Sequence, residues 1–183
     1  MSSPDLDSRS VASDLADELR SGIVVIDGPS GAGKSSFADQ LMSALGERRR
    51  GAVLIRTDEF ATWDDPVGWW PELEHEVLQA YTRRHDYRHR PRVWRGDTAE
   101  PGPRVWIRWE PLLVIEGVSS ARNAMADRAD HALWLDGPTA PERLERAVAR
   151  DGESAREHLR RWQDFEAGWF AVDRTRERCR VIG

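Results

Sequence analysis

Short runs of aliphatic residues recur along the chain, and each is bounded by glycine or by polar residues. The run from Ile23 to Ile26 is the clearest, because four β-branched residues follow one another between glycines. Runs of this length without polar alternation are typical of strands that are buried on both faces of a sheet. We therefore predict five strands, over residues 23–26, 52–55, 112–115, 131–135 and 180–182.

Helical periodicity separates these strands. Val11, Leu15 and Leu19 lie on one stripe of a predicted helix over residues 11–20, with Ser10 as its N-cap. Strands that alternate with helices are joined by right-handed crossovers, so we predict a three-layer α/β domain with a five-stranded parallel sheet. The other predicted helices cover residues 34–45, 119–128, 139–151 and 154–172.

The segment over residues 61–110 departs from this pattern. It is rich in tryptophan, arginine and proline, and a predicted helix over residues 71–82 is followed by irregular chain. A long irregular insert in a compact domain is usually functional or disordered. Its aromatic residues favour an ordered flap that covers a substrate. We predict a flexible tail over residues 1–9 and one domain over residues 10–183.

The composition excludes several classes of protein. The chain has 183 residues, with 27 Lys and Arg against 32 Asp and Glu, and its net charge is −5. This balance argues against a nucleic-acid partner that is bound by phosphate neutralisation. No apolar stretch approaches the roughly 18 residues of a membrane span, and the N-terminus lacks the layout of a signal peptide. Cys179 is the single cysteine and cannot form an intramolecular disulfide, which fits a cytoplasmic protein.

Residues Gly28–Ser35 form the strongest motif, because they match G-x-x-x-x-G-K-[ST] at every fixed position. A predicted buried strand precedes the motif and a predicted helix follows it, as a phosphate-binding loop requires. Backbone N–H groups of such a loop and the positive end of the helix dipole face phosphate oxygens. Lys34 is the only lysine of the chain, which indicates a position where a slender ammonium group is needed.

The loop predicts a nucleotide site. Lys34 would contact the β- and γ-phosphates and the hydroxyl of Ser35 would hold Mg²⁺, so ATP and Mg²⁺ are the expected ligands. The residues expected to bind the nucleotide are Gly28, Ser30, Gly31, Ala32, Gly33, Lys34, Ser35 and Ser36.

Two carboxylates follow buried strands whose ends meet the loop in an open α/β sheet. Glu116 ends the predicted strand over residues 112–115, where it would orient the shell of Mg²⁺. Asp58 follows the strand over residues 52–55 and is a candidate base for a hydroxyl that attacks the γ-phosphate. Glu59 is the competing candidate for the base, and a helix N-cap is the structural alternative for Asp58.

Arg143, Arg146 and Arg150 lie at i, i+3 and i+7 and share roughly one face of the helix over residues 139–151. They would either close over the phosphates or form a solvated face paired with neighbouring glutamates. Other aromatic and basic residues of the insert, among them Trp63 and Trp94, would either stack on a flat substrate or pack the flap.

With these residues in place, the sequence resembles the uridine kinase-like family of P-loop kinases. The resemblance spans residues 23–183 and lies in the phosphate loop, in Thr57–Phe60, in Trp63–Pro66, in Ile115–Gly117 and in a lid helix. It implies that Asp58 is the base near a nucleoside 5′-hydroxyl. It further implies that Asp64 binds sugar hydroxyls beside Trp63, that Ser35 and Glu116 serve Mg²⁺, and that Arg146 and Arg150 are lid arginines.

The chain departs from the family at the residues that read the base. The Tyr-Asp-Phe segment of uridine kinases corresponds here to Arg92-Val93-Trp94, so that Trp94 alone keeps an aromatic ring. The lid, over about residues 138–157, lacks the Arg-Gly-Arg of the family, and Arg156 is the nearest equivalent.

The resemblance implies the strand order 2-3-1-4-5 and a kinase that phosphorylates a hydroxyl of a small molecule with ATP and Mg²⁺. A nucleoside such as uridine or cytidine is the favoured acceptor. The alternatives are a nucleoside monophosphate, a sugar, a cofactor precursor or an antibiotic as acceptor, and a nucleotide-binding regulatory module. We expect neither a nucleic-acid nor a membrane partner, and the sequence does not predict the oligomeric state.

Overall fold

A five-stranded parallel sheet forms the centre of the computed structural model, which describes residues 4–95 and 98–182. Its strands lie in the order β2-β7-β1-β8-β9. Because β7 is the third of the five predicted strands, the predicted order 2-3-1-4-5 is confirmed. The bounds are Gly22–Asp27 for β1, Ala52–Arg56 for β2, Leu112–Glu116 for β7, His131–Leu135 for β8 and Arg180–Ile182 for β9.

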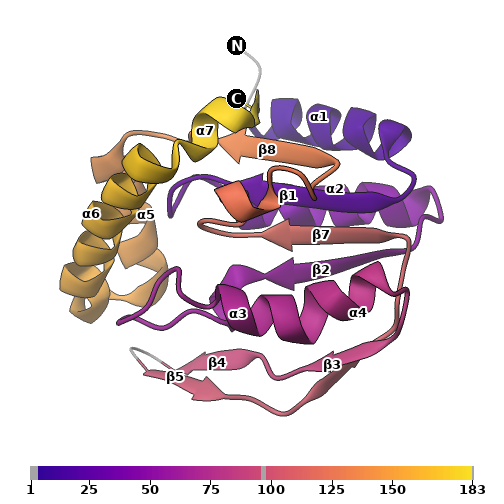
Figure 1. The fold of residues 1–183 in the computed structure, drawn as a ribbon. Coiled ribbons are helices and arrows are strands. Elements are labelled where there is room, and N and C mark those ends of the chain that lie inside the picture. The colour runs from indigo at the N-terminus through magenta and orange to yellow at the C-terminus, as the bar shows by residue number, and fades with distance from the viewer. Residues whose placement is uncertain (1–3, 96–97, 183) are drawn as a thin grey trace.

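Helices cover both faces of the sheet (Figure 1). Successive residues of β1 point to opposite sides of the sheet, so they enter two different cores. Val24 and Ile26 pack into one core with α1 (Pro4–Glu18) and α2 (Lys34–Glu47). Ile23 and Val25 pack into a second core with the helical segment at the start of the insert. This double burial explains the continuous β-branched run.

The predicted helix over residues 71–82 is present as one helical segment of three parts. It consists of α3 (Trp70–Leu73), a π-helical stretch (Glu74–Leu78) and α4 (Gln79–Thr82). Leu73, Val77 and Leu78 are fully buried against the sheet. The segment therefore fixes the start of the insert to the body of the domain.

The rest of the insert is not irregular chain, as we had expected, but two short antiparallel ladders. β3 (Tyr87–His89) pairs with β6 (Val105–Ile107), and β4 (Arg92–Arg95) pairs with β5 (Thr98–Pro101). In β3, Tyr87 and His89 are buried and Arg88 is exposed, so the period of two residues is present but brief. Strands of three or four residues leave too little pattern to be recognised in the sequence.

Two other expectations about secondary structure are wrong. The first helix begins at Pro4, within the predicted flexible tail, so Ser10 lies inside the helix and does not cap it. Proline is favoured in the first turn of a helix, where its missing N–H costs nothing. Residues 119–128 form turns around a short 3₁₀ helix (Asn123–Met125), because their backbone N–H groups bind side chains of other elements.

The C-terminal helices α5 (Ala140–Asp151), α6 (Arg156–Asp173) and α7 (Thr175–Arg178) pack beside one end of the sheet (Figure 1). α5 begins with a capping box, in which Thr139 and Glu142 satisfy each other's backbone N–H groups. The predicted helices over residues 139–151 and 154–172 are thereby confirmed.

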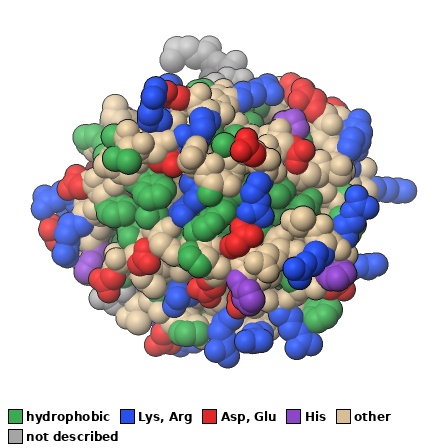
Figure 2. Space-filling model, viewed as in Figure 1, with side chains coloured by type: hydrophobic (Ala, Val, Ile, Leu, Met, Phe, Trp, Pro, Cys, Tyr) green, Lys and Arg blue, Asp and Glu red, His purple; other side chains and the backbone are tan. Residues whose placement is uncertain are grey.

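Acidic and basic side chains are interspersed on the face that Figure 2 shows. Ion pairs near the surface include Arg48 with Asp17 and Arg128 with Glu74. Within the part of the chain that the structure describes, no helix has the length and apolar character that a membrane crossing needs.

Candidate active site

A cavity of about 710 Å³ lies at the carboxyl ends of β1, β2 and β7. Cavities of this size accommodate nucleotides and other small ligands. Most of the predicted site residues line it. They are Ser30, Gly31, Gly33, Lys34, Ser35, Ser36, Asp58, Trp63, Trp94, Glu116, Arg146 and Arg150.

The phosphate loop joins β1 to α2, and its first glycine is required by a close contact. A Cβ at Gly28 would lie 2.2 Å from the carbonyl oxygen of Leu135, and Gly28 has a φ of +140°. Neither Gly28 nor Ala32, which were expected to bind the nucleotide, lines the cavity. Lys34 is buried, and its ammonium donates to the carbonyl oxygen of Pro29 at 3.0 Å. This contact holds the ammonium against the loop.

Ser35 and Glu116 meet across the cavity, as expected for residues that share a metal ion. The hydroxyl of Ser35 donates to Oε1 of Glu116 at 3.3 Å, and Nε of Arg56 lies 3.6 Å from Oε2. Burial raises the pKa of Glu116, whereas the charges of Lys34 and Arg56 lower it. A hydroxyl beside a carboxylate is an oxygen donor set of the kind that Mg²⁺ prefers, so these residues fit the ion.

Asp58 and Glu59 lie in one 3₁₀ turn (Thr57–Glu59) but have different surroundings. Asp58 lines the cavity. Oε2 of Glu59 lies 3.1 Å from Nε2 of His89, which is buried in the flap. Of the two carboxylates, only Asp58 lines the cavity that contains the phosphate loop.

Three tryptophans from separate parts of the chain form one aromatic wall of the cavity. The ring of Trp63 lies 5.2 Å from those of Trp94 in β4 and Trp162 in α6, with edge-to-face geometry in both pairs. Trp94 donates its indole N–H to the backbone oxygen of Asp58 at 3.0 Å. The indole N–H of Trp63 is buried without a hydrogen-bond partner in the described structure, whereas the indole of Trp162 is hydrogen-bonded to the side chain of Glu166.

Some predicted residues are not brought to the cavity. Asp64 is exposed and does not line the cavity, although the preceding residue, Trp63, does. Arg156 forms ion pairs with Glu145 and Glu153 away from the cavity. Trp162 was missed, because one tryptophan in an amphipathic helix resembles a core residue.

The lid arginines differ in their partners. Arg146 and Arg150 of α5 both line the cavity, whereas Arg143 donates to the carbonyl oxygen of Pro138 at 2.7 Å. Arg150 forms a bidentate ion pair with Asp151, with both contacts at 2.6 Å. Arg146 has no ion-pair partner within residues 4–95 and 98–182, which leaves its guanidinium available to an anionic ligand.

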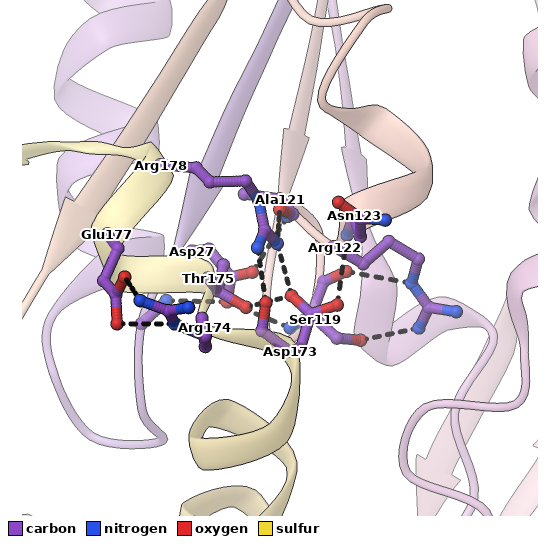
Figure 3. Close-up of polar contacts among 11 residues, drawn as sticks. Asp27, Ser119, Ala121, Arg122, Asn123, Asp173, Arg174, Thr175, Glu177 and Arg178 are labelled. Atoms are coloured by element: carbon purple, nitrogen blue, oxygen red, sulfur yellow. Dashed lines mark hydrogen bonds and ion pairs between the residues drawn. The ribbon is translucent and has the colours of Figure 1, made fainter.

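Asp27, at the end of β1, joins the phosphate loop to the loop after β7 (Figure 3). Its carboxylate accepts the backbone N–H groups of Gly28, Ser119 and Ala121 at 2.7–2.9 Å. Burial raises the pKa of Asp27 to about 7, against the hydrogen bonds and the charge of Lys34, which lower it. The sequence analysis did not identify Asp27 as a functional residue, although an acidic residue between a buried strand and the phosphate loop can be recognised in the sequence.

The same loop is bound on its other side by the end of α6. Asp173 accepts the backbone N–H of Asn123 at 3.1 Å and forms an ion pair with Arg178 (Figure 3). Arg122 is buried, and its guanidinium donates to the carbonyl oxygen of Val67 at 2.6 Å. The rings of Trp69, Trp70 and Trp169 surround this guanidinium at 4.5–5.1 Å. The loop that follows Glu116 thus joins the sheet, the flap and α6.

No protein-family model and no curated protein sequence matches the chain. Solved structures do match it. A possible uridine kinase from Bacillus stearothermophilus aligns with a TM-score of 0.68 and 17% identity, over 97% of this chain and 98% of the other. A candidate fructose transport system kinase from Silicibacter sp. TM1040 aligns with a TM-score of 0.58 and 19% identity, over 95% of both chains. These likenesses show that the chain has the fold of P-loop kinases.

Proposed function

We propose that the protein is a kinase that transfers the γ-phosphoryl group of ATP to a hydroxyl of a small molecule. One observation carries the proposal: the phosphate loop, the Ser35–Glu116 pair and the Asp58 carboxylate line a single cavity. A phosphate loop by itself would also suit a regulatory module. A carboxylate that faces the loop is what an acceptor hydroxyl requires.

The loop residues would bind ATP through backbone N–H groups and Lys34, at the N-terminus of α2. Ser35 and Glu116 would hold Mg²⁺, which neutralises charge on the phosphates when it is bound. Gly31 packs against Arg143, so the start of α5 lies directly against the loop.

Asp58 would accept the proton of the acceptor hydroxyl as its oxygen bonds to the γ-phosphorus. The bond between that phosphorus and the bridging oxygen breaks, and ADP leaves with the electron pair. Arg146 would neutralise negative charge on the attacking oxygen of the acceptor and on the bridging oxygen that leaves with ADP. Positioning and charge neutralisation supply most of the catalysis in such reactions.

A nucleoside such as uridine or cytidine is the favoured acceptor. The aromatic wall of Trp63 and Trp94 offers stacking surfaces for a flat base, and a structural neighbour is described as a possible uridine kinase. A sugar is the second candidate, because the other neighbour is described as a candidate kinase of a fructose transport system. Aromatic rings also pack against the apolar faces of sugar rings.

A phosphoryl-transfer screen tests the proposal. The purified protein is given ATP and Mg²⁺ with separate nucleosides, nucleotides, sugars and cofactor precursors, and the products are identified by mass spectrometry. Lys34→Ala and Asp58→Asn are compared with the wild type. Glu59→Gln is the matched control, because it neutralises the adjacent carboxylate, which faces His89 instead of the cavity.

Phosphorylated uridine or cytidine that is lost in Lys34→Ala and Asp58→Asn, but kept in Glu59→Gln, is the expected result. Transfer to a sugar would keep the mechanism and replace the acceptor. Nucleotide binding without transfer to any acceptor would contradict the kinase and favour the regulatory module.

A further inference from the structure

Glu166 is a buried carboxylate that contacts the phosphate loop but does not belong to the Gly28–Ser35 motif. It lies in the middle of α6 and is only 1% exposed. Its Oε2 accepts the backbone N–H of Ser30 at 2.9 Å, and its Oε1 accepts the hydroxyl of the same residue. Ser30 lies between Pro29 and Gly31, so α6 holds the loop at its tip.

The charges around Glu166 make this contact unusual. Phosphate loops attract anions, and here a protein carboxylate already uses one of the loop N–H groups. Lys34 of α2 is the charged group that most favours the ionised form, and Arg143 of α5 packs over the adjacent Gly31 while its guanidinium binds Pro138. Burial nevertheless raises the pKa of Glu166.

Phosphates bound in the loop would bring two or more negative charges close to Glu166 and draw Lys34 toward themselves. Two anions that share one cation in a water-poor site repel each other strongly, and a carboxylate in this position becomes easier to protonate. Arg143 packs over Gly31, but its guanidinium is turned to the carbonyl oxygen of Pro138, so Lys34 is the cation that Glu166 and the phosphates would share.

We propose that Glu166 is a positioning residue whose charge is linked to nucleotide binding: it holds Ser30 in the free loop and takes up a proton when the nucleotide phosphates enter. The inference rests on the proposed ATP site. The proton comes from solvent, and Glu166 takes no part in the transfer itself. ATP affinity then falls as the pH rises, because the proton becomes harder to supply.

Glu166→Gln tests this inference, because glutamine keeps the shape and an acceptor for the Ser30 N–H but carries no charge. Binding of ATP with Mg²⁺ is measured by calorimetry at several pH values from 5 to 8, each in two buffers with different ionisation enthalpies, which gives the number of protons taken up at each pH. Glu157→Gln is the matched control, because Glu157 is on the same helix, is 59% exposed and pairs with Arg160.

The wild type and Glu157→Gln are expected to take up protons when ATP binds, and Glu166→Gln is expected to take up fewer. Glu166→Gln should also bind ATP about three- to tenfold more tightly, which corresponds to a rise of up to one unit in the pKa of Glu166 on ATP binding. Equal uptake in all three proteins, or weaker binding by Glu166→Gln with unchanged uptake, would overturn the inference while leaving the ATP site intact. Failure of the wild type to bind ATP would instead refute the proposed function and the inference with it.

Thermal melting establishes whether Glu166→Gln is folded. If it is not, Ser30→Ala gives a second test. Removal of the hydroxyl makes the ionised form of Glu166 less stable. A larger fraction of the free protein then already carries the proton on Glu166, so fewer protons are taken up when ATP binds. Unchanged uptake in Ser30→Ala would count against the inference.

Discussion

The carboxylate of Asp27 accepts the backbone N–H of Ser119 at 2.9 Å, although 92 residues separate the two in the chain. Oδ1 of Asp27 also accepts the N–H of Gly28, which begins the phosphate loop. Ser119 is turned toward this carboxylate with a φ of +64°, a conformation that residues other than glycine seldom adopt. One buried side chain therefore fixes the phosphate loop relative to the strand end that carries Glu116.

Asp27→Asn should weaken the fold. An amide has one oxygen and one NH₂ group, so it cannot accept all three backbone N–H groups that the carboxylate binds. We expect the free energy of unfolding to fall by about 2 kcal/mol at pH 8, where Asp27 is ionised, which is typical of lost hydrogen bonds to a charged group. Urea unfolding followed by tryptophan fluorescence measures it. An unchanged unfolding midpoint would mean that the loop does not depend on this residue.

Asp27 should also make stability depend on pH. Burial raises its pKa to about 7 in the folded protein, from 3.8 in an unperturbed chain. Between these values the folded state keeps a proton that the unfolded state has lost, so stability falls as the pH rises, by up to about 1.4 kcal/mol per pH unit. The difference in stability between wild type and Asp27→Asn is therefore expected to shrink between pH 5 and pH 8. A difference that is constant with pH would contradict the raised pKa.

Cys179 should react slowly with thiol reagents in the native protein. Burial raises its pKa to about 12, and the nearby charge of Asp27 adds to the rise. Because the thiolate is the reactive form, labelling at pH 8 should be about a hundredfold or more slower than in the urea-unfolded chain. Absorbance of the released aromatic thiol reports the rate, and the single cysteine makes the signal unambiguous. Fast labelling without denaturant would show that the C-terminal segment opens readily.

The sheet and the phosphate loop could be predicted because their signals are local. Four consecutive β-branched residues define β1, and Gly28–Ser35 matches its motif at every fixed position. Asp58 and Glu116 followed from the rule that ligands bind at the carboxyl ends of parallel strands. These residues need only their own neighbours in sequence to be recognised.

The remaining contacts join distant parts of the chain and leave no local pattern. Glu166 is 136 residues from Ser30, and in the sequence it is one more acidic residue on a helix that is rich in charge. Trp162 faces the cavity only because of how α6 packs against the flap. The helical prediction over residues 119–128 was wrong for the same reason, since Asp27 binds the backbone there instead of a helical hydrogen-bond ladder.

Trp63→Phe tests whether the aromatic wall contributes to acceptor binding. The change keeps an aromatic ring beside Trp94 and Trp162 but removes an indole N–H that is buried without a partner in the described chain. We expect the KM for the acceptor to rise about three- to tenfold, with the KM for ATP unchanged, since one hydrogen bond is worth about 1 kcal/mol. Steady-state kinetics with Trp169→Phe as the control measures this, because Trp169 contacts Arg122 outside the cavity. Equal effects of the two changes would indicate general loss of packing.

Arg146 and Arg150 should contribute unequally to catalysis, although both line the cavity. The bidentate pair with Asp151 raises the pKa of Arg150 and fixes its guanidinium, whereas Arg146 has no ion pair in the described part of the chain. Arg146→Ala is expected to lower kcat by about tenfold or more, because a cation near the transferring group stabilises the transition state, and Arg150→Ala should have a smaller effect. Asp151→Asn then serves as the deciding variant. Release of Arg150 from its partner should raise the activity of Arg146→Ala if either arginine can reach the phosphates, and no recovery would assign that role to Arg146 alone.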